Sequence, residues 1–516
     1  MHSAVSNLYP VRSVSQQFRQ RTGLVFLAVC SLAFISLRGF SQTGHEIRVT
    51  IPAFQNAPVI LAHYLATENT FIPDDTVKMD KTGSGVFKGS KPLTGGMYII
   101  FLPSRKYFDV LLGDDQNLSV VADTNDLVNG VKFQGSVDNE LFYEYRIMLG
   151  SKNKAVTNLN EKKKGATSEQ QKDSITKAID GINKEVRETV KKTISEHPGL
   201  YLATWLKSMQ EVDIPDFPRD SAGKILDSTF QYRYYHKHYF DNFNPADARL
   251  LHTPFYENKI KYYFEKIVPP IPDSINLEID QLIAKVRSNK EIYDYILGFF
   301  YKHFADQANQ IVGMDGVFVY FAEKYYLPFA SVIDPKFTEN LKKDLARLKP
   351  NLIGATAPEI RLIEVPKDHF LLARTDTAVR SSTQIGSLVE LHDIKAKYLV
   401  LAFWESDCGH CIKEMPVLYD SVYPLIRDKG AKIVAIQLIS GIEGKRKWVD
   451  FVNEHKMYDW INAVPDGFGY KDLYNVFSTP SLYVLDENKK IIAKRIGVSQ
   501  IGKVIEIETL KAQRKK

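Results

Sequence analysis

The stretch Tyr398-Leu399-Val400-Leu401-Ala402-Phe403-Trp404-Glu405-Ser406-Asp407-Cys408-Gly409-His410-Cys411 decides the fold of the C-terminal part of the chain. Its first seven residues form a continuous apolar run, as in a central strand that is buried on both faces. A short polar turn then leads directly to a Cys-x-x-Cys pair. Helical and strand patterns alternate on both sides of this stretch, which predicts an α/β domain over residues 350–516, with helices on both faces of a mixed sheet.

The two cysteines stand at the start of a predicted helix that runs to about residue 428. Unpaired N–H groups and the positive end of the helix dipole stabilise an anion there, so they lower the pKa of Cys408 and favour its thiolate. Cys411 follows one turn later, within bridging distance. We therefore expect Cys408 to attack a partner's sulfur and Cys411 to resolve the mixed disulfide. His410, between them, can favour the Cys408 thiolate as a cation or as a hydrogen-bond donor.

The third cysteine, Cys30, lies in a segment that is typical of an export signal. Three arginines within residues 12–21 precede an apolar run over residues 24–37, and small, turn-prone residues follow at 39–42. This pattern predicts a signal peptide over residues 1–42 and export to the periplasm or cell envelope, with a retained membrane anchor as the less favoured alternative. An exported chain with one Cys-x-x-Cys pair has no disulfide framework, so the simplest use of the pair is redox cycling.

Other uses of the cysteine pair fit less well. A structural zinc site needs four ligands, and His236 and His238 lie about 170 residues upstream. Covalent haem attachment needs a histidine after the second cysteine, where Ile412 stands. A local structural disulfide gains little, because so short a loop loses little entropy. We therefore expect no metal and no other cofactor.

Two further regions precede the redox domain, so a multidomain protein is predicted. Over residues 45–137, short apolar or alternating runs are separated by glycines and polar turns, which predicts an all-β domain of the sandwich type. Over residues 138–345, apolar residues recur at steps of three or four, most regularly over 167–197, which predicts an α-helical domain. The many aromatic residues of this second region are expected to pack between helices, with a ligand-binding groove as the alternative.

The charge balance argues against a nucleic-acid-binding protein. The chain has 67 basic and 61 acidic side chains, a formal net charge of +6. Residues 1–41 contribute four arginines and no acid, so their removal leaves 63 basic and 61 acidic side chains. Such a chain lacks the basic surface that nucleic-acid binding requires.

Residues 350–512 resemble the thioredoxin superfamily, and within it the envelope thiol–disulfide oxidoreductases of the TlpA and ResA type. The residues that carry the likeness are Phe403-Trp404, Cys408-Gly409-His410-Cys411, Pro416 and Thr479-Pro480. The resemblance implies protein thiols and disulfides as partners, together with an upstream electron donor. It also implies a cis Thr479-Pro480 bond that faces the cysteines, and only an X-Pro bond adopts cis at low cost. Trp404 is expected to pack beneath the site and, with Gly409 and Thr479, to contribute to substrate binding.

Three residues bear on how this domain handles protons. Ala402 stands where classical thioredoxins carry a buried aspartate, so that proton acceptor is missing. The ResA-like branch uses a glutamate three residues after the second cysteine, here Glu414, which helical spacing puts beside Cys411. An exposed carboxylate next to Lys413 is the equal alternative for Glu414. Asp407 directly precedes the first cysteine, and its negative charge opposes formation of the thiolate.

The function expected from these observations is an exported thiol–disulfide oxidoreductase that reduces or isomerises disulfides of envelope proteins, with apocytochrome c as one candidate substrate by family likeness. The alternative is an envelope binding or assembly protein whose N-terminal domains recognise a partner, with an accessory redox domain. The stretches 113–118 and 133–141 resemble modules that precede such domains in Bacteroidetes-type envelope proteins. That likeness implies partner recognition or homodimerisation for residues 45–345. The direction of the redox reaction stays open.

Overall fold

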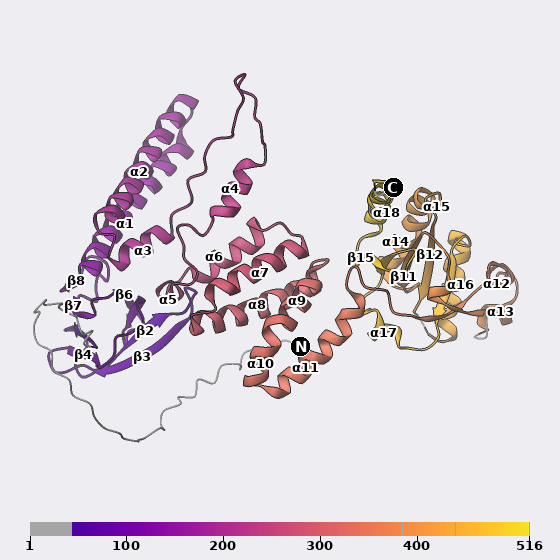
Figure 1. The fold of residues 1–516 in the computed structure, drawn as a ribbon, viewed down its shortest axis with the longest axis horizontal. Helices are drawn as coiled ribbons and strands as arrows, with labels where there is room; N and C mark the ends of the chain where they lie inside the picture. Colours follow the sequence, from indigo (N-terminus) through magenta and orange to yellow (C-terminus); the bar gives the residue numbers. More distant parts are fainter. Residues whose placement is uncertain (1–43, 383–385, 439, 515–516) are drawn as a thin grey trace, which may run out of the picture. The chain divides into compact units, whose positions relative to one another are not determined.

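The computed structural model describes residues 44–382, 386–438 and 440–514, so the signal peptide predicted over residues 1–42 lies outside the described residues. A β-sheet region, a helical region and an α/β region follow one another along the chain (Figure 1), which confirms the predicted fold class. None of the helices in the described ranges combines the length and the apolar character that a membrane crossing requires.

The N-terminal region consists of two four-stranded sheets, in the orders β4-β1-β7-β8 and β3-β2-β5-β6. The strands are β1 (His45–Thr50), β2 (Pro58–Tyr64), β3 (Phe71–Lys78), β4 (Ser84–Gly89), β5 (Gly96–Phe101), β6 (Tyr107–Leu112), β7 (Asn117–Ala122) and β8 (Val131–Gln134). Both sheets contribute buried residues to one hydrophobic core, as in the predicted sandwich.

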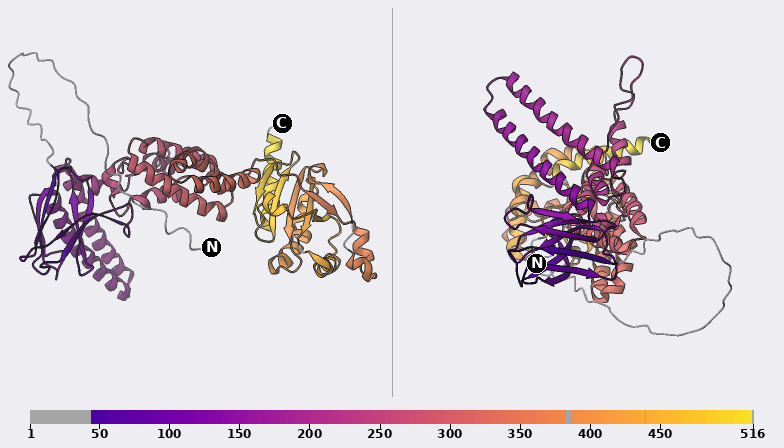
Figure 2. Two further views of the ribbon diagram at one scale, coloured as in Figure 1. Left: turned by 90° about the horizontal axis from the view of Figure 1, so that it is seen from below. Right: turned by 90° about the vertical axis from the view of Figure 1, so that its left-hand side faces the viewer.

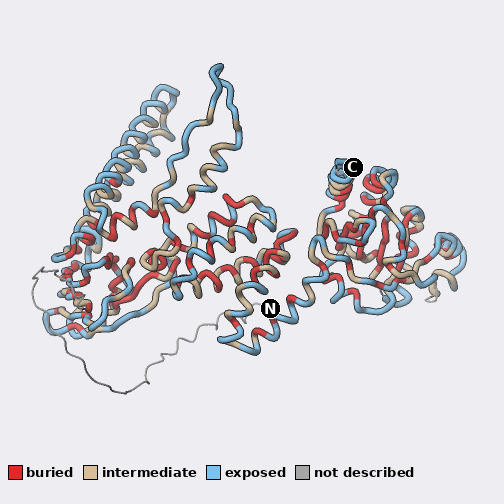
Figure 3. Tube along the Cα trace, in the orientation of Figure 1, coloured by how far each residue is buried: buried red, intermediate tan, exposed pale blue. Residues whose placement is uncertain are grey.

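Three helices continue the core of the sandwich: α1 (Val137–Gly165), α2 (Glu169–Glu196) and α3 (Tyr201–Ser208). α1 and α2 lie side by side along their length (Figure 2), and much of their surface is exposed (Figure 3). Asn139, fully buried in the first turn of α1, fixes this helix to β6. Its side-chain amide accepts from the N–H of Leu111 and donates to the carbonyl of Leu111, both at 2.7 Å.

The helical region has a hydrophobic core of its own. Its helices are α4 (Phe230–His238), α5 (Ala248–Leu251), α6 (Tyr256–Tyr262), α7 (Pro272–Val286), α8 (Lys290–Gln310), α9 (Met314–Phe321), α10 (Leu327–Ile333) and α11 (Pro335–Leu348). Aromatic rings form much of this core, for example the edge-on pair of Phe264 and Phe300, whose centroids are 4.9 Å apart. The aromatic residues therefore pack between helices, as predicted for most of them.

The C-terminal region is built on one seven-stranded sheet in the order β10-β9-β13-β12-β11-β14-β15. The strands are β9 (Arg361–Glu364), β10 (Ser387–Glu390), β11 (Tyr398–Trp404), β12 (Ala431–Gln437), β13 (Ile461–Pro465), β14 (Ser481–Asp486) and β15 (Ile491–Lys494). Strands β11, β12 and β13 are parallel, and β14 is antiparallel to β11.

All seven residues of β11 are buried, because both faces of the sheet are covered. Alternate residues such as Val400 and Trp404 face a core shared with α14 (Gly409–Val417), α16 (Gly441–His455) and α18 (Val498–Arg514). Leu399 and Leu401 face the other core, which includes residues of α17 (Tyr470–Leu473). A strand between two apolar layers has no polar face, which explains its continuous apolar run.

Candidate active site

The cysteine pair lies where β11 gives way to α14, at the carboxyl end of a central parallel strand. β11 ends at Trp404, and Cys408 is the N-cap residue of α14, with extended backbone angles (φ −78°, ψ 123°). Both cysteines are free thiols. Cys408 is partly exposed and Cys411, within the first turn, is fully buried. Only the first sulfur is therefore open to a partner.

The pKa of the Cys408 thiol is lowered. Partial burial acts in the opposite direction, but it is outweighed by hydrogen bonds from the Thr479 side chain and from the backbone N–H groups of Cys411 and His410. These N–H groups are among those that a helix leaves unpaired at its first turn. The direction is the one expected for a thiol at a helix N-terminus.

Cys411 shows the opposite behaviour. Burial raises the pKa of its thiol to about 12, against weaker opposing hydrogen bonds from the Glu405 backbone and the Thr479 side chain. The neighbouring Cys408 sulfur adds to the increase. The inner sulfur therefore keeps its proton at neutral pH, and the outer sulfur is the more acidic thiol.

The loop before β14 faces the outer sulfur. Its Thr479-Pro480 bond is cis, as the resemblance implies. The Thr479 carbonyl lies 3.4 Å from Cys408 Sγ and accepts the S–H of the thiol form. The Thr479 hydroxyl lies 3.2 Å from a carboxylate oxygen of Glu405 and donates to it. A hydroxyl has one hydrogen, so the Cys408 sulfur and the Glu405 carboxylate compete for the same donor.

Glu405 was not predicted as a site residue. Its backbone N–H bonds the Cys411 sulfur and its carboxylate reaches Thr479, so it touches both halves of the site. The available signal was its position, since it is the first charged residue after a fully apolar strand and precedes the cysteines by three residues. Its contact with Thr479, 74 residues further along the chain, was not visible in that spacing.

Three other predicted site residues, Glu414, His410 and Asp407, differ in how they relate to the cysteines. Glu414 is half-buried in α14, three residues after Cys411. The His410 side chain is exposed, and its described influence on Cys408 comes through the backbone N–H. Asp407 forms an ion pair with Lys447 at 3.4 Å, which offsets the negative charge that would oppose the thiolate.

Trp404 is fully buried beneath the site, with its ring 5.2 Å from that of Phe451. It therefore supports the turn from below, and its contribution to substrate binding stays a prediction. Gly409, the first residue of α14, is exposed, and a Cβ placed there would meet no atom within 4 Å. The space around the Cβ position of Gly409, directly after Cys408, is therefore open.

Two family models match the chain. The model described as Redoxin matches residues 353–512, which contain the cysteine pair and the Thr479-Pro480 loop. A model described as a domain of unknown function, DUF5106, matches residues 161–346.

Curated relatives match part of the chain. The thiol-disulfide oxidoreductase ResA of Bacillus cereus is 31% identical over 114 residues, and ResA of Oceanobacillus iheyensis is 32% identical over 142 residues. These matches cover 22% and 27% of this chain, respectively, and 62% of each relative. The chain thus spans about three fifths of the length of the curated relatives it matches.

Solved structures match as well. A domain of a possible thiol-disulfide isomerase from Cytophaga hutchinsonii is 32% identical, and the match covers 32% of this chain and 97% of that chain with a TM-score of 0.26. A thioredoxin-like protein from Bacteroides caccae is 20% identical, and the match covers 58% of this chain and 99% of that chain with a TM-score of 0.41.

Proposed function

Because the C-terminal region is a thioredoxin-superfamily domain of the TlpA and ResA type, we propose that the protein exchanges the Cys408–Cys411 dithiol with disulfides of partner proteins. The observation that carries this proposal is the asymmetry of the pair, in which the outer thiol has a lowered pKa and the inner thiol a raised one. The nucleophile in such exchange is the thiolate. The same asymmetry supports the order in which Cys408 attacks and Cys411 resolves.

The proposed reaction has two exchange steps. The Cys408 thiolate attacks one sulfur of a partner disulfide, which forms a mixed disulfide and releases the other partner sulfur as a thiolate. Cys411 then loses its proton and attacks the Cys408 sulfur, which forms the Cys408–Cys411 disulfide and releases the second partner sulfur. Two electrons pass from the dithiol to the partner, so an upstream donor must reduce the pair before the next cycle.

The proton of Cys411 needs an acceptor in the second step. We propose Glu405 and Glu414 as the two candidates, since each belongs to a segment that flanks Cys411. Glu405 is favoured by its contact with Thr479, which also bonds the sulfurs. Glu405→Gln and Glu414→Gln form a matched pair of variants. The acceptor is the glutamate whose replacement slows release of the mixed disulfide while the rate of its formation is kept.

We further propose export to the cell envelope, with envelope proteins as partners and apocytochrome c among the candidate substrates. The sequence pattern of residues 1–42 supports export, and membrane attachment would require retention of that segment. As domain boundaries we propose 45–137, 138–345 and 350–516, with α1 to α3 packed on the core of the first domain. Residues 45–345 are proposed to recognise a partner or to form a homodimer.

Two cysteine variants test the proposal with insulin as the model disulfide. Wild-type protein with dithiothreitol is expected to precipitate insulin chains faster than dithiothreitol alone. Cys408→Ser should abolish this activity. Cys411→Ser should accumulate a mixed disulfide with insulin that is visible on a non-reducing gel, because the resolving thiol is absent. Full activity of Cys408→Ser, or a stable mixed disulfide in that variant, would overturn the assignment.

The alternative function is an envelope binding or assembly protein with an accessory redox domain. It is supported by the share of the chain that precedes the Redoxin match, which begins at residue 353. It predicts that a strain carrying Cys408→Ser grows and assembles its envelope normally, while deletion of the whole protein does not. A shared defect in both strains would contradict it.

A further inference from the structure

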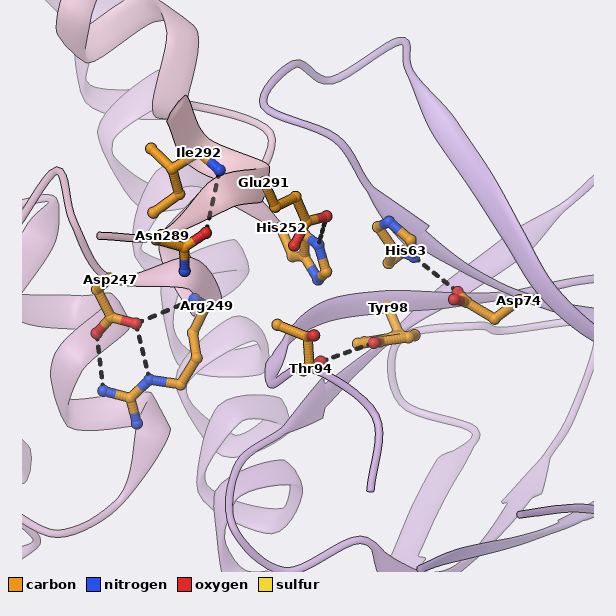
Figure 4. Close-up of polar contacts among 10 residues, drawn as sticks. All are labelled: His63, Asp74, Thr94, Tyr98, Asp247, Arg249, His252, Asn289, Glu291 and Ile292. Atoms are coloured by element: carbon orange, nitrogen blue, oxygen red, sulfur yellow. Dashed lines mark hydrogen bonds and ion pairs between the residues drawn. The ribbon is translucent and has the colours of Figure 1, made fainter. Parts of the chain in front are cut away.

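A cluster of titratable side chains outside the cysteine site joins three segments that are distant in sequence. His63 lies in β2, His252 directly follows α5, and Glu291 lies in the first turn of α8. Their potential ligand atoms all lie within 4.8 Å of one another. Figure 4 shows the three side chains together, with Asp74 of β3 on the outer side of His63.

Both imidazole rings are buried, with 8% of His63 and 3% of His252 exposed. They stack with centroids 4.0 Å apart. Nδ1 of His63 lies 2.8 Å from a carboxylate oxygen of Asp74, and Nε2 of His252 lies 3.0 Å from one of Glu291 (Figure 4). One nitrogen of each imidazole ring thus lies within hydrogen-bond distance of a carboxylate oxygen.

The second nitrogen of His252 has no such partner. Nδ1 of His252 is buried and lacks a hydrogen-bond partner within the part of the chain that the structure describes. A buried polar atom without a partner costs about 1–3 kcal/mol, and native proteins leave few of them. Among the described residues, the His252 ring is therefore held by its Nε2 contact with Glu291 and by its stack on His63.

The charge of the cluster favours a cation. Asp74 and Glu291 bring two carboxylates, and in the described ranges each pairs with a histidine and with no lysine or arginine. The nearby Arg249 is held by Asp247 through two side-chain hydrogen bonds (Figure 4). The ring of Tyr98 flanks both histidines and brings no charge to the cluster.

We propose that His63, His252 and Glu291 bind one divalent transition-metal ion of the zinc class, with Asp74 as the outer carboxylate that orients His63. Two imidazoles and one carboxylate form a donor set that suits such ions. Protein ligands of this kind commonly hold a carboxylate on the second ring nitrogen, which is the contact between His63 and Asp74.

The distances between the ligand atoms in the structure show which side chains must move when an ion binds. Bonds of about 2.0–2.1 Å in a tetrahedral site place two ligand atoms about 3.3 Å apart. The 3.0 Å between His252 Nε2 and Glu291 Oε1 is close to that span. The ion must draw the His63 ring inward and tilt it away from its stack on His252. Once bound, it would tie β2 of the sandwich to α8 of the helical region.

The test uses the full chain with Cys30→Ser, Cys408→Ser and Cys411→Ser, so that none of its three thiols can bind the probe. Zn²⁺ titration by calorimetry and Co²⁺ titration by visible absorbance are then compared among variants in this background. His63→Gln, His252→Gln and Glu291→Gln change the cluster. His238→Gln is the matched control, because His238 also pairs with a carboxylate, Asp241 at 2.7 Å, but lies outside the cluster.

We expect one equivalent of Zn²⁺ per chain, with an affinity that falls at least about tenfold in each cluster variant and is unchanged in His238→Gln. Co²⁺ should give the absorption bands of a nitrogen- and oxygen-ligated ion. Absence of stoichiometric binding, or equal binding by Glu291→Gln, would overturn the proposal. Circular dichroism checks that each variant is folded. If a histidine variant unfolds, the result for Glu291→Gln decides the test, because the Glu291 side chain is 46% exposed and its replacement is tolerated more easily.

Discussion

The asymmetry of the two thiols predicts a large difference in their rates of alkylation. With a pKa of about 12, Cys411 is about 0.01% thiolate at pH 8. A thiol of ordinary pKa, ~8.5, is about 25% thiolate at that pH, and the pKa of Cys408 is lowered. Ionisation alone therefore disfavours Cys411 by more than ~10³-fold relative to an ordinary thiol. The more basic thiolate is the better nucleophile, with a Brønsted coefficient of about 0.4–0.5. This higher nucleophilicity of the Cys411 thiolate reduces the difference in rate by a factor of about 25–60.

The net expectation is that Cys411 is alkylated about 40–100-fold more slowly than an ordinary thiol at pH 8, so that Cys408 takes up the label first, and the complete burial of Cys411 adds to this difference. The reduced chain is treated briefly with iodoacetamide, quenched and digested, and the label is located by tandem mass spectrometry. The same reaction in guanidinium is the control, because unfolding should make the two rates similar. Comparable labelling of both cysteines in the native chain, or faster labelling of Cys411, would refute the reasoning.

Three further predictions concern single side chains. Thr479→Val should raise the pKa of Cys408 by about one to two units, measured by thiolate absorbance, because it removes a hydrogen bond to a charged group worth about 1.5–3 kcal/mol; an unchanged titration would contradict the assigned bond. Asn139→Ala should destabilise the N-terminal region by about 2–4 kcal/mol in urea unfolding, since it leaves two backbone groups of β6 unpaired; a loss below ~1 kcal/mol would count against this account. Burial lowers the pKa of Lys445 to about 8, so the unfolded chain binds the extra proton between pH 8 and about 10.5, and the contribution of Lys445 to stability should rise with pH across that range. Lys445→Met should therefore stabilise the protein at pH 7, and this gain over wild type should shrink as the pH rises; a gain that stays constant would exclude the mechanism.

The parts of the fold that were predictable from the sequence are those set by neighbouring residues. The buried strand before Cys408 is a continuous apolar run, and the helix start follows it directly, so strand, turn and helix were all visible in one stretch. The helix predicted over residues 167–197 is found at Glu169–Glu196 for the same reason, since its apolar stripe is local.

The rest depends on which surfaces meet across long separations in the chain. The sequence marked a change from strands to helices near residue 138, but it did not indicate that α1 to α3 complete the core of the sandwich. The contact between Glu405 and Thr479 and the cluster around His63 were missed for the same reason. Each contact joins residues that are far apart in the sequence and follow no helical or strand periodicity, so only the folded chain brings them together.

The single hydroxyl hydrogen of Thr479 links the oxidation state of the pair to the charge of Glu405. With Cys408 as a free thiol, the hydroxyl donates to the carboxylate. A Cys408 thiolate is a strong competing acceptor for that hydrogen, whereas a disulfide sulfur accepts weakly. Thermodynamic coupling of this kind is reciprocal. Any partner that neutralises Glu405 on docking therefore stabilises the reduced pair, and the reduction potential becomes a property of the encounter with the partner as well as of the isolated domain.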